Sequence, residues 1–100
     1  MQLVIVMGVE AHESQVNALF EEQGVPVFSR MDIEGYNLRQ QAADTGWFGG
    51  RNIPAYSVLN FSFMEEATAE GLMERIRDFN QREQLRNPLR AFRMPVAETV

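Results

Sequence analysis

A chain of 100 residues, 45% of them apolar and 10% aromatic, has the composition of a globular protein, and we expect residues 1–100 to form one domain. Its formal charge of −5 argues against nucleic acid as a partner, because an acidic surface repels phosphate. The lack of cysteine excludes disulfides and thiolate chemistry. With no signal-like or membrane-spanning run, we expect a cytoplasmic protein. A chain this short buries only about 60–65% of its unfolded surface, so we also expect it to oligomerise.

The first third of the chain alternates between strand and helix patterns. Leu3–Met7 is a continuous apolar run that predicts a buried strand. Between Glu10 and Gln23 the apolar residues recur at helical spacing, and Gly24 stands where a helix C-terminal cap is expected. The two-residue period over residues 27–34 predicts a second strand.

The second half repeats this alternation after a long gap. Residues 35–54 show no sustained periodicity, so they predict a long loop. Strands are predicted over residues 55–63 and 89–96, and an amphipathic helix over 66–82. The order βαββαβ predicts an α+β, ferredoxin-like sandwich in which two helices cover one face of a four-stranded antiparallel sheet.

The other face of this sheet must meet solvent or another subunit. We expect it to carry Tyr56, Val58 and either Phe28 or Phe92, which are too apolar to remain fully exposed. The face therefore favours a partner subunit.

The second and last predicted strands carry a family resemblance. Gly35-Tyr36-Asn37 leaves the second strand before the long loop, and Ala91-Phe92-Arg93-Met94-Pro95-Val96 lies near the end of the chain. With the βαββαβ order, this resembles the PII-like superfamily. The resemblance implies a non-enzymatic signal-transduction protein, a homotrimer with small-molecule effectors in clefts between subunits. It further implies an adenine nucleotide, bicarbonate or a divalent metal as ligand, and regulation of a membrane transporter or efflux component.

The same resemblance implies a set of ligand-binding residues. Arg90 stands where PII proteins place a phosphate-contacting lysine, and a guanidinium suits that role. Gly35 matches the glycine at the base of the effector loop, and Arg39 and Gln40 fall near the ligand contacts of the loop base. The glycine-rich phosphate turn is absent, and Pro88 removes a backbone donor, which argues against tight ATP binding. We therefore expect a divergent PII-like protein rather than a nitrogen-regulatory PII.

The loop itself contains Trp47-Phe48-Gly49-Gly50-Arg51, two large aromatic residues beside paired glycines. We expect residues 36–53 to form a mobile effector arm, with Trp47, Phe48, Gly49 and Gly50 as a docking tip for a partner. Alternatively, both rings tuck under the loop or against a neighbouring subunit.

The arginines near the last strand divide into two groups. Arg90 and Arg93 are three residues apart, so they point to opposite faces of a regular strand and do not share one ligand. Arg90 pairs better with Arg51 or Arg86 in an anion site. Alternatively, these are solvated surface arginines.

Signals for metal binding or catalysis are weak. His12 is the sole histidine, and with Glu10 and Glu13 it is thin evidence for a metal site, so the sequence assigns no metal ligands. No nucleophile–base pair is visible. The alternative to a sensor is a small dimeric α/β-barrel enzyme of the monooxygenase or isomerase type, with a cavity lined by Asn60, Tyr56 and Trp47.

Overall fold

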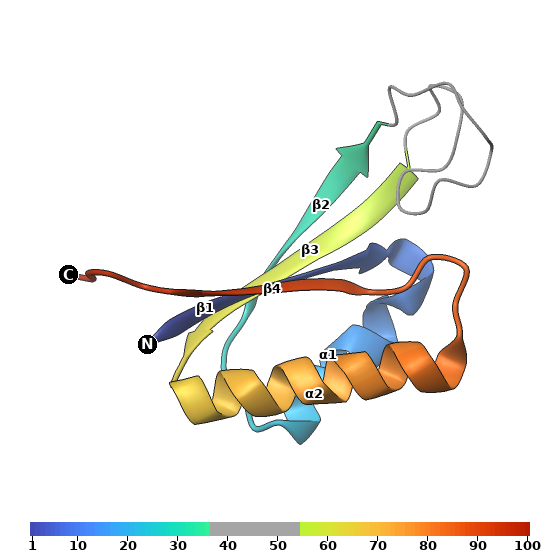
Figure 1. The fold of residues 1–100 in the computed structure, drawn as a ribbon. Helices are drawn as coiled ribbons and strands as arrows, with labels where there is room; N and C mark the ends of the chain where they lie inside the picture. The colour runs from blue at the N-terminus through green and yellow to red at the C-terminus, as the bar shows by residue number, and fades with distance from the viewer. Residues whose placement is uncertain (37–54) are drawn as a thin grey trace.

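The computed structural model of the chain describes residues 1–36 and 55–100, which fold in the predicted βαββαβ order (Figure 1). The predicted loop lies almost entirely outside these ranges. The elements are β1 (Gln2–Val9), a short 3-10 helix (Glu10–His12), α1 (Glu13–Glu22), β2 (Ser29–Gly35), β3 (Ala55–Met64), α2 (Glu66–Glu83) and β4 (Arg90–Pro95).

Each predicted strand and helix is present, with ends shifted by a few residues. The first helix differs most, because its first turn, Glu10–His12, is a 3-10 helix and the α-helix begins only at Glu13. Gly24 has φ +79°, as a left-handed helix cap requires. α2 also ends in a left-handed residue, Gln84 at φ 47°. Sequence periodicity did not reveal that second cap, because Gln84 is not a glycine.

The strands form one antiparallel sheet in the order β2-β3-β1-β4. β1 lies between β3 and β4, and β3 pairs with β2, so β2 and β4 are the two edges. Both helices lie on one side of the sheet, and the β2–β3 hairpin extends beyond them (Figure 1). The predicted ferredoxin-like α+β class is therefore confirmed.

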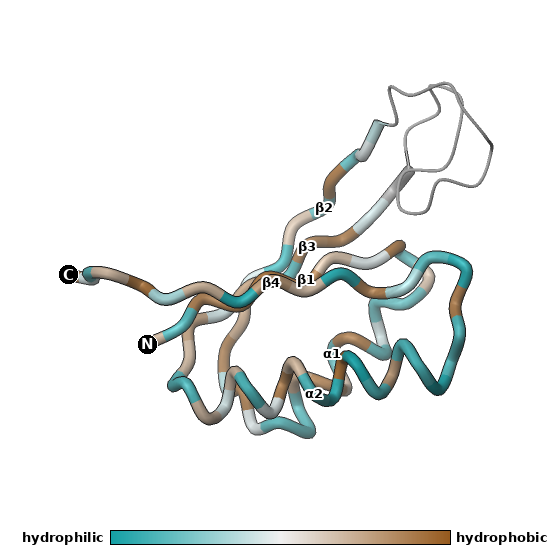
Figure 2. Tube along the Cα trace, in the orientation of Figure 1, coloured by the Kyte–Doolittle hydropathy of each residue, from teal (hydrophilic) through white to brown (hydrophobic). Residues whose placement is uncertain are grey.

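The hydrophobic core lies between the helices and the sheet. Figure 2 shows apolar stretches along the strands and on the helices beneath them. Phe20 on α1 is fully buried, and its ring stands edge-on to that of Phe28 at 4.7 Å. The core cluster contains Val4, Val6, Val16, Leu19, Phe20, Val25, Met64, Ala69, Leu72, Ile76, Phe79 and Leu89.

The strand register decides which face of β3 the helices cover. Val4 and Val6 of β1 are fully buried and lie opposite Ser62 and Asn60. Since neighbouring residues across a sheet share a face, the even-numbered residues of β3 point toward the helices. Asn60 is 1% exposed and Ser62 is 5% exposed. The polar side of β3 is thus the buried one.

This register corrects the residues predicted for the open face, by which we mean the sheet face without helices. The prediction for Val58 is wrong, because it is 2% exposed on the helix side. Phe28 packs against the core instead. Phe92 does lie on the open face, opposite Ile5, and is 46% exposed. The side chain of Tyr56 lies outside the described residues.

Candidate functional site

The open face is strongly apolar across all four strands. Phe63 is 52% exposed, Met31 48% and Met94 37%. The register places further apolar residues between them, so the apolar set on this face is Leu3, Ile5, Met7, Met31, Ile33, Leu59, Phe61, Phe63, Phe92 and Met94. Contiguous apolar surface of this kind marks an interaction site.

The start of β4 is held by a side chain that the sequence did not reveal. Asn80 on α2 donates from Nδ2 to the Leu89 carbonyl at 2.9 Å and accepts from the Leu89 N–H at Oδ1, also at 2.9 Å. Its amide therefore satisfies both backbone groups of Leu89. Leu89 is also 3% exposed, so its backbone is fixed by these two hydrogen bonds and its side chain by burial. Arg90 begins β4 directly after Leu89.

Arg90 and Arg93 point to opposite faces, as their spacing predicted. Arg90 is opposite Met7 and belongs to the open face, whereas Arg93 is opposite Val4 on the helix side. Arg93 forms an ion pair with Glu70 of α2 at 3.7 Å. Arg90 is exposed at the start of β4. The guanidinium of Arg90 is therefore the better placed of the two to meet a ligand at the open face.

A shallow hollow of about 260 Å³ lies beside the start of β4, and Arg90 lines it. Apolar residues of α2 and β4 contribute to its wall, together with Asn80 and a second guanidinium, that of Arg77. Arg77 also forms an ion pair with Glu74 one turn away. Of the arginines suggested as partners of Arg90, Arg51 lies outside the described residues and Arg86 lies in the turn before β4. Arg77 and Arg90 thus line the same hollow, which sequence spacing did not suggest.

The loop base lies far from Arg90 within one chain. Gly35 ends β2 and is paired with Ala55, whereas Arg90 starts β4 at the opposite edge of the sheet. The register leads from Arg90 across three strand spacings to β2, and Gly35 lies four residues further along β2. The Cα atoms of Arg90 and Gly35 are therefore separated by roughly 20 Å. The other predicted ligand residues, Arg39, Gln40 and Arg51, and the predicted docking residues Trp47, Phe48, Gly49 and Gly50 lie outside the described residues.

A larger hollow than the one beside Arg90 lies at the β2 edge. It measures about 490 Å³ and is lined by Glu10, Asp32, Ile33, Glu34 and Ser57. Its carboxylates would repel an anion and attract a cation. Nevertheless, within residues 1–36 and 55–100 no three carboxylate or imidazole groups are close enough to hold a metal ion together. His12 therefore gains no metal-binding partners from the described part of the chain.

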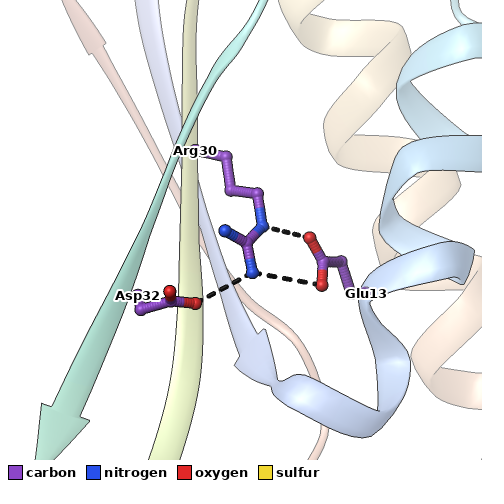
Figure 3. Close-up of polar contacts among 3 residues, drawn as sticks. All are labelled: Glu13, Arg30 and Asp32. Carbon is purple, nitrogen blue, oxygen red and sulfur yellow. Dashed lines mark hydrogen bonds and ion pairs between the residues drawn. The ribbon is translucent and has the colours of Figure 1, made fainter.

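The β2 edge is tied to α1 by Arg30 (Figure 3). Arg30 donates to both carboxylate oxygens of Glu13, and its Nη2 donates to Asp32 Oδ1 at 2.8 Å. The hydrogen bond to Glu13 raises the pKa of Arg30 above its ordinary value, and the charge of Asp32 adds to the shift. The guanidinium therefore stays charged and holds the edge strand against the helix layer.

Of the residues suggested for a catalytic cavity, the structure describes only the side chain of Asn60. Asn60 is 1% exposed beneath the helices, so its amide does not face solvent. Trp47 and the side chain of Tyr56 lie outside the described residues. Asn60 is therefore not an accessible polar group for that alternative.

The arrangement of the sheet, helices and long β2–β3 connection is that of the PII-like fold. A PII-like protein of Thiomonas intermedia K12 named CPII superposes with a TM-score of 0.65 at 13% identity, over 93% of this chain and 85% of that one. CutA1 from Pyrococcus horikoshii gives 0.63 at 18% identity, over 100% and 87%. A protein of Shewanella baltica from the duf3240 family gives 0.62 at 14%, over 99% and 92%.

A second structure of the Thiomonas protein contains ADP, AMP and bicarbonate, and it matches this chain at 12% identity with a TM-score of 0.63. No protein-family model matches the chain. No curated protein matches it in sequence. Identities this low establish a shared fold and a divergent sequence.

Residues 1–36 and 55–100 include no helix with the length and apolar character needed to span a bilayer.

Proposed function

We propose that this chain is a PII-like regulatory protein that binds a small anionic ligand at Arg90 and signals through the segment between β2 and β3. The observation that carries the proposal is the exposed side chain of Arg90 at the edge of an open apolar face, directly after Leu89, whose backbone is held by Asn80. The PII-like fold supports a regulatory role, although a fold alone does not determine function.

The assembly that we propose is a homotrimer built on the open face. Ten apolar side chains line this face, and a small domain gains stability by burying such a surface against another subunit. A dimer would instead favour the α/β-barrel enzyme alternative. Light scattering distinguishes the three states, because a monomer, a dimer and a trimer differ by multiples of 11.5 kDa.

The ligands that we propose to test are adenine nucleotides and bicarbonate, because a protein of the same fold contains ADP, AMP and bicarbonate. A divalent metal is the alternative ligand. The purified chain is titrated by calorimetry with ATP, ADP, AMP, cyclic nucleotides, bicarbonate and divalent metals. Trp47 is the only tryptophan in the chain, so its fluorescence provides a second signal from the proposed signalling segment. A membrane transporter is the class of regulated partner that we propose.

Replacement of Arg90 tests the site directly. Arg90→Ala should weaken binding of an anion about ten- to a hundredfold, since a hydrogen bond to a charged group contributes roughly 1.5–3 kcal/mol. The matched control is Arg93→Ala, which removes an arginine of the same strand from the helix side. Equal affinity of the wild type and the Arg90→Ala variant for an identified anion would remove Arg90 from the site.

A further inference from the structure

Methionine is the only sulfur-containing residue type in this chain. The sequence contains six methionines and no cysteine, so thiol oxidation and disulfide exchange are excluded. A methionine thioether is oxidised reversibly to a sulfoxide, which converts a flexible apolar side chain into a polar one. Any response of this chain to an oxidant at sulfur therefore involves methionine.

The methionines are divided between the two sides of the sheet. Met31 of β2 and Met94 of β4 lie on the open face, where they are 48% and 37% exposed. Met7 of β1 lies on the same face, on a strand between those two edges. By contrast, Met64 is 7% exposed in the core, and Met73 of α2 is partly buried against that core. The two exposed thioethers of the strands thus belong to the apolar face that the helices leave open.

The register places these methionines among other apolar side chains of the open face. Met31 and Met7 both lie opposite Leu59, so the three residues form one row across the sheet. Met94 belongs to the same row as Phe63, which is 52% exposed. Side chains in one row of a sheet are neighbours on the same face. A polar atom added to either exposed sulfur would therefore lie among apolar side chains.

We propose that the open face is a redox-sensitive assembly surface, in which hydrogen peroxide converts Met31 and Met94 to sulfoxides and so prevents the face from being buried against further copies of this chain. The proposal rests on the homotrimer of the proposed function. In each conversion the thioether sulfur bonds to one peroxide oxygen, the O–O bond breaks, and the other oxygen leaves as water with both hydrogens. The sulfur loses two electrons and the peroxide gains them.

Oxidation changes the energetics of assembly because a sulfoxide oxygen is a hydrogen-bond acceptor. On a single chain this oxygen stays in water, since both side chains are exposed. In the trimer it would be buried among apolar side chains, and a polar group buried without a partner costs free energy. The unoxidised thioether has no such cost, and its flexibility suits packing against irregular apolar surfaces. Oxidation therefore penalises the assembled state and leaves the folded single chain almost unchanged.

Assembly and oxidation should compete for the same side chains. The trimer shields Met31 and Met94 from the oxidant, whereas the dissociated chain leaves them accessible. Since dissociation increases on dilution, both residues should be oxidised faster at low protein concentration. The oxidised chain then stays dissociated until its sulfoxides are reduced. Methionine sulfoxide reductases, which act on one sulfoxide epimer each, return it to the starting state.

Graded oxidation of the full chain by hydrogen peroxide tests the switch. Light scattering measures the mass of the assembly, and mass spectrometry of peptides measures the sulfoxide content of each methionine. Conversion of Met31 and Met94 should raise the concentration at which the trimer dissociates by about tenfold or more. Met64 in the core should be oxidised last. Treatment with both classes of methionine sulfoxide reductase should restore the trimer.

Leucine variants separate these two methionines from other oxidative damage. Leucine is close to methionine in volume and apolar character but has no sulfur, so the double variant Met31→Leu with Met94→Leu should assemble as the wild type does. It should remain a trimer at a peroxide dose that dissociates the wild type. Met73→Leu is the matched control, because it removes a partly buried methionine of α2 and should leave the sensitivity unchanged. Dissociation of the double variant at the same dose overturns the proposal.

Protein concentration supplies a readout that needs no substitution. The rate of sulfoxide formation at Met31 and Met94, relative to that at Met73, is measured in excess peroxide over a dilution series. We expect this ratio to fall as the concentration rises, because assembly covers the open face and not α2. A ratio that stays constant while the mass changes from one chain to three would overturn the competition and the proposal with it.

The switch and the proposed function fail separately. A trimer that keeps its mass after Met31 and Met94 are fully converted to sulfoxides would overturn the switch and leave the homotrimer standing. A chain that is monomeric at every concentration before any oxidant is added would overturn the homotrimer, and the switch with it.

Discussion

The helix-covered face of the sheet contains buried polar residues, whereas the open face contains exposed apolar ones. Beneath the helices, β3 contributes Asn60 and Ser62, which are 1% and 5% exposed. On the open face, Phe63 and Phe92 are 52% and 46% exposed. Burial in one chain is thus set by which face the helices cover, not by which face is more apolar. An apolar face without helices is what a domain retains when another subunit completes its core.

The largest change in stability should come from a substitution on the helix-covered side of the sheet. Phe20→Ala should lower the free energy of unfolding by about 3–5 kcal/mol, because a fully buried ring is replaced by a cavity. Urea unfolding at fixed protein concentration measures the loss. Val27→Ala is the control, since Val27 is 72% exposed and should change stability by less than about 0.5 kcal/mol. Similar losses for both variants would remove the distinction between covered and uncovered residues.

On the open face, the effect should fall on assembly. Phe92→Glu should weaken self-association by roughly 2 kcal/mol or more, because a charge would be buried in an apolar contact. Light scattering across a concentration series should show the mass shifting toward one chain while circular dichroism remains native. Val27→Glu introduces the same charge at an exposed apolar position outside the strands, and its mass should match the wild type. An unchanged mass for Phe92→Glu would mean that the open face is not the interface.

At the start of β4, Asn80→Ala should cost about 1–3 kcal/mol of stability, since both backbone groups of the buried Leu89 lose their hydrogen-bond partner. The variant should also weaken anion binding through Arg90, whose backbone follows Leu89. Asn17→Ala removes an exposed amide from α1 and serves as the control in unfolding and titration experiments. Full anion affinity in a measurably destabilised Asn80→Ala protein would limit Asn80 to a structural role.

The smallest effect should come from Arg30→Gln at the β2 edge, where the ion pairs are solvent-exposed. The pKa of Arg30 is raised in the folded chain, so its stabilising contribution is fully present below the ordinary arginine pKa and is lost only as pH rises through the folded value. The stability difference between wild type and variant should therefore be constant from about pH 6 to pH 9 and smaller at high salt. A difference that changes across this interval would assign the effect to another titrating group.

Sequence periodicity was sufficient to predict the strands and helices. It was not sufficient to predict which face of a strand is buried when both faces carry apolar residues. The periodicities predicted each strand and helix, and Gly24 predicted the end of α1. The alternation in β3 was also detected, yet Val58 was placed on the wrong face, because Leu59, Phe61 and Phe63 on one side and Val58 on the other are all apolar. Periodicity separates two faces but does not say which one the helices cover.

The amino-acid sequence by itself determined the order of elements, the spacing that sends Arg90 and Arg93 to opposite faces, and the PII-like resemblance. These depend on residues close together in the chain, whose geometry follows from the two-residue and 3.6-residue periods. Only the tertiary structure decided that Asn80 anchors Leu89 and that Arg77 and Arg90 line one hollow. It alone also placed Arg90 and Gly35 at opposite edges of the sheet. Those relations depend on strand order and on helix packing between distant segments, which no local pattern encodes.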